Sequence, residues 1–180
     1  MNITKTSIDG LIVFSPKIHS DERGYFFENF RRNHFDELKL DIDFVQENES
    51  MSQENTARGL HLQAPPFAQD KLIRVIKGSI LDVAVDVRKK SPTYGKHIAI
   101  ELNEHNKKSF LVPKGFAHGF CCLENDTIVN YKCSDYYNQN SEMGLYWNDP
   151  ALGIEWPISD PIVSEKDKVQ PSLQDFKSPF

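Results

Sequence analysis

Alternation of apolar and polar residues along short segments is the feature that most limits how this chain can fold. In residues 79–87 every second residue from Leu81 onward is aliphatic, and Asp82, Ala84 and Asp86 lie between them. A period of two is typical of a β-strand with one buried face. Residues 71–77 are also apolar-rich and are joined to this strand by Gly78, so the two segments are expected to form a β-hairpin.

Most of the remaining chain follows the same pattern. Short apolar runs lie at 11–14, 25–30, 57–63, 97–102, 109–112, 120–123, 127–133 and 143–147, separated by turn-forming residues. The runs at 11–14 and 25–30 are expected to flank a turn at 20–24. Helical spacing is confined to residues 32–40 and to a short segment after Ser164, a suitable N-cap.

Many short strands with little helix predict an all-β protein, an antiparallel barrel or sandwich. A jelly-roll barrel with short flanking helices fits well, because the mouth of such a barrel can hold a ligand. The 180 residues contain no repeat, linker or low-complexity segment, so residues 1–180 are expected to form a single domain.

Charge and cysteine content narrow the functional classes. The net charge of −5 lies entirely in residues 134–180, which carry 3 basic and 8 acidic groups. Scattered Lys and Arg argue against a nucleic-acid surface, and no apolar run is long enough for a membrane span or signal peptide. Cys121, Cys122 and Cys133 are odd in number, which favours reduced structural thiols. We expect a soluble, cytoplasmic protein.

Two histidines are candidate site residues. In a strand over 57–63, His61 would share one face with Gly59 and Gln63, and Arg58 would face the other way. His61 could be a ligand, a base or a hydrogen-bonded interior residue. His118 ends a Pro-x-Gly-x-x-His segment that resembles the second metal-binding motif of the cupin barrels. The first cupin motif would supply His-x-His, where this chain has an amide at Gln63, so we expect no bound metal.

Lys71 and Tyr131 are unremarkable if each is taken alone. Lys71 begins an apolar strand, and Tyr131 shares a strand face with Val129 and Cys133. The plain interpretations are a solvated strand end and a core aromatic residue. Together with an inward histidine they would supply a cation, an acid and a base, which suits proton abstraction next to a carbonyl group.

The chain as a whole resembles the dTDP-4-dehydrorhamnose 3,5-epimerases. The resemblance covers nearly its full length, in ordered segments at 21–28, 44–50, 58–63, 68–74, 82–88, 113–120, 136–138, 147–150, 153–157 and 164–167. It implies a metal-free, cofactor-free cupin jelly roll. The implied activity is epimerisation at C3 and C5 of dTDP-4-dehydro-6-deoxy-D-glucose, giving dTDP-4-dehydro-L-rhamnose in the pathway to dTDP-L-rhamnose.

The resemblance also implies residue roles. His61 would be the general base with Asp167 as its orienting carboxylate, Tyr131 the acid on the opposite face of the sugar, and Lys71 the partner of the enolate oxygen at C4. Binding of the diphosphate would fall to Arg23 and Arg58 with help from Lys166; Gln46, Asn48, Glu28, His118 and Glu142 would position sugar or thymidine, and Tyr137 would stack on the base. Family members are dimers with exchanged N-terminal strands, so Arg23, Phe26 and Glu28 would serve the neighbouring subunit's site.

Three alternatives remain open at the level of sequence. Related enzymes epimerise only C3 or only C5, and others isomerise a 4-keto sugar by ketone migration. A non-catalytic cupin that binds a sugar or a metal is a third possibility. Tyr131 favours true epimerisation, whereas the loop that follows His61, residues 63–67, could reshape the sugar pocket.

Overall fold

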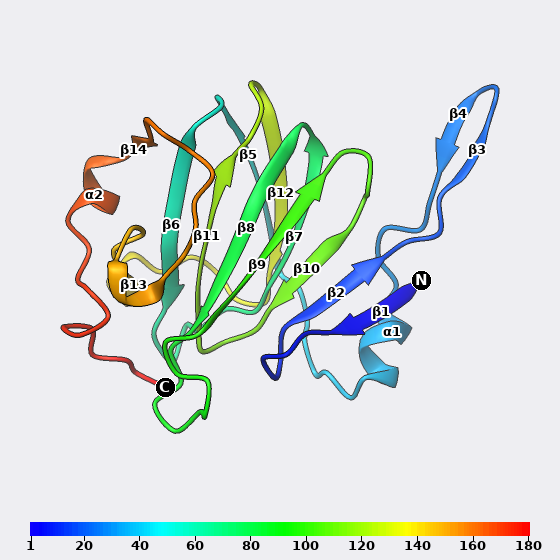
Figure 1. Ribbon diagram of the computed structural model, residues 1–180. Helices are drawn as coiled ribbons and strands as arrows, with labels where there is room; N and C mark the ends of the chain where they lie inside the picture. The colour runs from blue at the N-terminus through cyan, green and yellow to red at the C-terminus, as the bar shows by residue number, and fades with distance from the viewer.

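The computed structural model describes residues 1–180 and consists of two six-stranded sheets that face each other, with a separate two-stranded hairpin (Figure 1). The first sheet has the order β1 (Asn2–Lys5), β2 (Ile12–Ser15), β10 (Ser109–Val112), β7 (Lys71–Lys77), β12 (Thr127–Cys133) and β5 (Gln46–Ser52). The second has the order β13 (Glu142–Gly144), β6 (Thr56–Gln63), β11 (Phe116–Cys122), β8 (Ser79–Asp86) and β9 (His97–Asn103), and β14 (Ile162–Val163) pairs with β6. This arrangement confirms the predicted all-β, cupin-like jelly roll.

The helices are short and peripheral. α1 (Arg32–Glu37) confirms the predicted helix but ends earlier than residue 40. α2 (Glu165–Lys168) begins after Ser164, whose Oγ accepts a hydrogen bond from the N–H of Asp167 at 3.1 Å, as the N-cap prediction requires. Two single turns of 3-10 helix occupy Gln139–Ser141 and Pro150–Leu152. No helix is long and apolar enough to cross a membrane.

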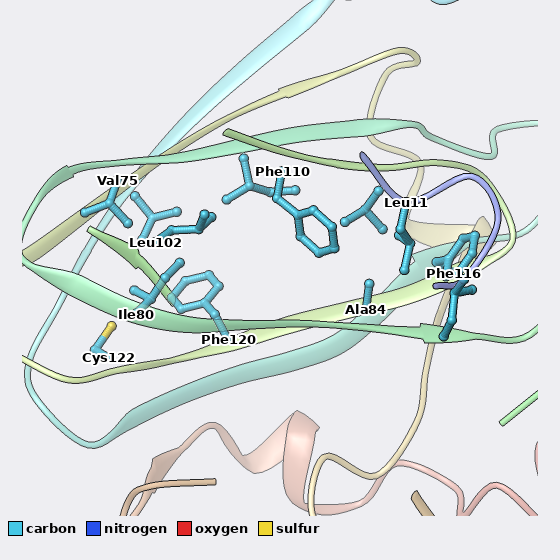
Figure 2. Packing of buried hydrophobic residues seen from close by; sticks show 13 residues of the cluster. Leu11, Val75, Ile80, Ala84, Leu102, Phe110, Phe116, Phe120 and Cys122 are labelled. Carbon is cyan, nitrogen blue, oxygen red and sulfur yellow. The ribbon is translucent and has the colours of Figure 1, made fainter. Parts of the chain in front are cut away.

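Large apolar side chains from both sheets fill the space between them (Figure 2). Phe110 from β10 and Ile80 from β8 are both fully buried, and Phe120 from β11 lies beside them. Cys122 belongs to the same cluster, and burial raises the pKa of its thiol to about 11. All three cysteines are buried and free, as predicted for structural thiols.

The predicted hairpin between residues 71–77 and 79–87 is wrong. β7 pairs with β10 and β12, whereas β8 pairs with β9 and β11, so the two consecutive strands belong to opposite sheets. Gly78, with a φ of +79°, turns the chain from one sheet into the other. Local alternation cannot distinguish such a corner from a hairpin.

The expectation of one solvent-facing side for residues 79–87 also fails. Asp82 and Asp86 are both 0% exposed. The opposite face is buried as well, because Val83 and Val85 pack against later residues that include Leu145 and Phe176. Coverage by the C-terminal part of the chain therefore makes β8 a strand with two buried faces.

The N-terminal strands differ from the predicted pairing as well. β4 (Gly24–Phe26) is shorter than the predicted 25–30 and pairs with β3 (His19–Asp21), while residues 12–15 pair with β1 and β10. In Figure 1 the β3–β4 hairpin projects away from the two packed sheets. We refer to this hairpin, residues 19–26, as the arm.

Candidate active site

A cavity of about 490 Å³ lies between the two sheets, and a smaller one of about 120 Å³ adjoins it. β5, β7 and β12 form one wall and β6 and β11 the other, with β14 and α2 at the rim. Most of the predicted site residues gather here: Arg58, His61, Lys71, His118, Tyr131, Lys166 and Asp167 line the larger cavity, and Gln46, Asn48, Tyr137 and Glu142 line the smaller. His61, Lys71 and Tyr131 border both.

His61 and Asp167 form a close pair. The His61 Nε2 lies 2.6 Å from the Asp167 Oδ1, and the second carboxylate oxygen accepts the N–H of Gly59 at 3.3 Å. Burial alone would raise the pKa of Asp167, but the hydrogen bond and charge of His61 outweigh it, and the pKa lies below its usual value. An ionised Asp167 accepts the Nε2–H of His61, which leaves Nδ1 as the unprotonated nitrogen.

An irregularity in β6 sets the direction of two side chains. His118 is opposite His61 and Phe120 is opposite Arg58, so β6 has one residue more than β11 over this span. In a regular strand, residues three positions apart face opposite sides. The extra residue in β6 is absorbed by a bulge, so Arg58 and His61 face the same side, and the prediction that Arg58 faces away is wrong. The backbones touch here: a Cβ on Gly59 would lie 2.5 Å from the Cα of Gly119.

Lys71 is a poorly solvated cation. Its Nζ has one hydrogen bond in the protein, to the carbonyl oxygen of His61 at 3.4 Å. Burial lowers the pKa of Lys71, while the nearby Cys133, Asp82 and Glu142 act in the opposite direction. The ammonium group therefore faces the cavity with most of its hydrogen-bonding capacity unused.

Asp82 is a site residue that sequence reasoning missed. Its two carboxylate oxygens lie 2.9 Å and 3.0 Å from the Nε2 of His118, and both side chains are buried. This second carboxylate–imidazole pair fixes the ring of His118 at the wall of the larger cavity. The sequence signal for it is an aspartate that alternates with aliphatic residues, a pattern that by itself predicts a side chain facing solvent.

Tyr131 and Asn48 stand opposite each other on β12 and β5. Burial raises the pKa of Tyr131 above its usual value, and a nearby Cys133 adds to the effect, whereas Asn48 and Arg58 oppose it. The phenol is therefore protonated at neutral pH and available as a proton donor.

Several hydrogen-bonded side chains line the smaller cavity. Glu142 accepts the hydroxyl of Tyr137 at 3.0 Å and forms an ion pair with Lys166. The backbone N–H of Tyr137 is held by Gln46 at 3.0 Å, and Gln46 also donates to Asn48 at 3.1 Å. These contacts place an exposed aromatic ring, a carboxylate and a cation at one opening.

Gln63 is held by the surrounding loops. Its Nε2 donates to the carbonyl oxygens of Phe67 and Tyr136, and its Oε1 accepts the N–H of Asn138 at 2.7 Å. The amide thus occupies the cupin histidine position but joins two loops. No three His, Cys, Asp or Glu side chains come together in a group that could hold a metal ion.

Arg23, Phe26 and Glu28 do not reach the cavity of their own chain. Arg23 is 84% exposed on the arm and pairs with Asp21. Phe26 is 71% exposed, and Glu28 contacts Arg31. Arg23 and Phe26 are therefore exposed on the projecting arm, and neither lines the larger cavity of its own chain.

Comparison with known proteins agrees with the sequence resemblance. The sequence model of the dTDP-4-dehydrorhamnose 3,5-epimerase family matches residues 5–175. The enzyme of that name from Methanothermobacter thermautotrophicus is 49% identical over 167 residues, covering 91% of this chain and 90% of the relative. The crystal structure of an epimerase from Legionella pneumophila in complex with dTDP-4-keto-L-rhamnose superposes with a TM-score of 0.93 at 43% identity, covering 98% and 94%. A 3′-monoepimerase from Streptomyces bikiniensis in complex with dTDP-quinovose has a TM-score of 0.88 at 34% identity, covering 94% and 86%.

Proposed function

This chain belongs to the dTDP-4-dehydrorhamnose 3,5-epimerase family of isomerases, and we propose that it inverts C3 and C5 of dTDP-4-dehydro-6-deoxy-D-glucose to give dTDP-4-dehydro-L-rhamnose. The observation that carries this proposal is the juxtaposition of a carboxylate-paired His61, a half-buried Lys71 and a protonated Tyr131 around one cavity. These groups supply the base, the cation and the acid that epimerisation next to a ketone needs.

The first step is proton abstraction by His61. A C–H bond beside the C4 ketone is weakly acidic, and its electron pair forms a C=C bond with C4 while negative charge moves to the C4 oxygen. The Nδ1 of His61 takes the proton, because Asp167 accepts the hydrogen of Nε2 and stabilises the imidazolium that forms.

The enolate oxygen is stabilised by Lys71. A cation that is already in place where negative charge develops, in a cavity that restricts water, lowers the barrier to proton abstraction, because the protein need not reorganise during the step. The few protein contacts of Lys71 leave its N–H groups free for this oxygen. His118, fixed by Asp82, lies on β11 in the opposite wall of the same cavity.

Inversion requires a proton from the other face of the sugar. His61 belongs to the second sheet and Tyr131 to the first, so the two approach the cavity from opposite walls. Tyr131 donates its phenolic proton to the carbanion carbon, the C4 ketone re-forms, and exchange with water restores both residues. The same sequence at the other carbon completes the second epimerisation.

The diphosphate is bound in the larger cavity, where Arg58 and Lys166 are suited to it. Gln46, Asn48, Tyr137 and Glu142 line the smaller cavity beside Lys71 and Tyr131, and they present amide, hydroxyl and carboxylate groups to the hexose. The arm would complete the site of a second copy in a homodimer, where Arg23, Phe26 and Glu28 would contact the partner's substrate.

The test is product analysis in deuterated water. The purified protein should convert dTDP-4-dehydro-6-deoxy-D-glucose without added cofactor, and NMR should show deuterium at both C3 and C5 of the product. Label and inversion at C3 alone would indicate a monoepimerase, like the Streptomyces relative, and a migrated ketone would indicate an isomerase. No turnover would refute the proposed function.

A further inference from the structure

Ser50 carries a buried hydroxyl group that has no hydrogen-bond partner. Only one other side-chain atom in the protein has this property, the Nδ1 of His34 in α1. Ser50 lies on β5 and lines the larger cavity together with Arg58 and Tyr131. A buried polar group without a partner is costly and rare in a folded protein, so its position against a ligand cavity is informative.

The neighbours of Ser50 make the missing partner more conspicuous. Every second residue of β5 points toward the cavity side, from Gln46 and Asn48 to Ser50 and Ser52. Gln46 donates to Asn48, and the Oγ of Ser52 accepts the Nε of Arg58 at 2.9 Å. Ser50 alone in this row has an unused hydroxyl group.

The position of Ser50 indicates which part of a ligand it meets. Asn48 is opposite Tyr131, and Ser52 is bonded to Arg58. In the proposed binding mode Tyr131 meets the hexose and Arg58 meets the diphosphate. Ser50 lies between Asn48 and Ser52 on β5. The terminal guanidinium nitrogens of Arg58 have no hydrogen bond in the protein, and a hydroxyl beside free guanidinium nitrogens is suited to a phosphate oxygen.

We propose that Ser50 is a further substrate-binding residue, whose hydroxyl donates a hydrogen bond to the phosphate that carries the hexose. This inference rests on the proposed function, because it takes the ligand to be a nucleoside diphosphate sugar. In the proposed complex, rotation of Ser50 about χ1 to another staggered position would turn its buried hydroxyl toward the ligand. The cost of the unpartnered hydroxyl is then relieved only when substrate is bound.

The test uses Ser50→Ala and dTDP as the probe, measured by calorimetry and thermal unfolding. A hydrogen bond to a charged group corresponds to about a tenfold or greater loss of dTDP affinity. KM for the sugar nucleotide should rise by a similar factor while kcat stays within about twofold, because Ser50 is assigned to binding. The ligand-free Tm should stay equal or rise, since an unpartnered polar group is removed.

Two further variants sharpen the result. Ser50→Thr keeps the hydroxyl and should bind dTDP with an affinity within about threefold of the wild type, a much smaller change than the tenfold loss expected for Ser50→Ala. Ser7→Ala changes an exposed serine outside the cavity and should alter neither affinity nor Tm.

The outcomes separate this inference from the proposed function. If Ser50→Ala binds dTDP as the wild type does, the assignment of Ser50 is wrong although the enzyme remains an epimerase. A markedly lower ligand-free Tm would also overturn it, because the hydroxyl would then support the fold. If the wild type neither binds dTDP nor turns over the sugar nucleotide, both proposals are wrong.

Discussion

Replacing Asp167 by asparagine tests the proposed base most directly. The substitution keeps size and shape but removes the charge that pairs with His61 at 2.6 Å. An asparagine amide can donate to Nε2, which would favour the tautomer with hydrogen on Nδ1. The lone pair of His61 would then point toward residue 167 instead of the substrate.

The expected loss follows from the geometry of the pair. Asp167 is 3% exposed, so its contact with the imidazolium formed during the reaction is little screened by water. A hydrogen bond to a charged group contributes about 1.5–3 kcal/mol. If that stabilisation is specific to the charged state, kcat/KM should fall by about 10- to 150-fold. The reversed tautomer would add to this loss.

The assay is kcat/KM together with the rate of deuterium incorporation into the substrate, and both should fall in parallel. Asp149→Asn is the matched control: Asp149 is also buried, but it accepts the N–H groups of Ala151 and Leu173, and it does not line the cavity. This control should lower Tm and leave activity per folded molecule unchanged. A kcat/KM of Asp167→Asn within twofold of the wild type would refute the orienting role.

Three other predictions concern the acid, the fold and the arm. Tyr131→Phe should still exchange substrate hydrogen with deuterated water but form product at least about 100-fold more slowly, since only reprotonation is lost; NMR that shows exchange abolished as well would contradict this. Asp86 has its pKa lowered from 3.8 to about 2, its burial being outweighed by hydrogen bonds chiefly from Arg88. The ionised Asp86 therefore contributes about 2 kcal/mol to the free energy of unfolding above pH 4, and this contribution is lost as the pH falls through 2. Urea unfolding should find Asp86→Asn destabilised relative to the wild type at pH 7 and not at pH 2. In the proposed homodimer, Arg23→Ala and His61→Ala should each be inactive alone. Unfolded together and refolded, they should regain about a quarter of wild-type activity, because half the dimers would be mixed and each mixed dimer would have one intact site; no recovery would argue against exchange of the arm.

Local sequence patterns predicted the strands well where local forces decide them. β10 and β12 have the predicted bounds, 109–112 and 127–133, because turn-forming residues flank them on both sides. Pairing between strands was beyond this reasoning. The corner at Gly78 uses the same residue type as a hairpin turn, and only the packing of both sheets separates β7 from β8.

The candidate site was predictable in its members but not in its supporting contacts. The resemblance to the epimerase family named the residues that line the two cavities. Asp82 was missed because alternation assigns an aspartate to the solvent side, whereas the C-terminal segment covers the other face of its strand. The inward direction of Arg58 depends on one extra residue in β6, which no periodicity reveals.

The contact between Gly59 and Gly119 has a consequence for how enzymes of this shape can diverge. A methyl group on either residue would meet backbone atoms of the opposite strand at 2.5 Å, and backbone cannot move aside as a flexible side chain can. Mutation at one position cannot be offset by mutation at the other, because both must lack a side chain. We therefore expect the two glycines to persist while the residues around the sugar change. An alignment would then rank them beside the catalytic residues, although they bind no substrate and serve only to let His61 and His118 stand on adjacent strands.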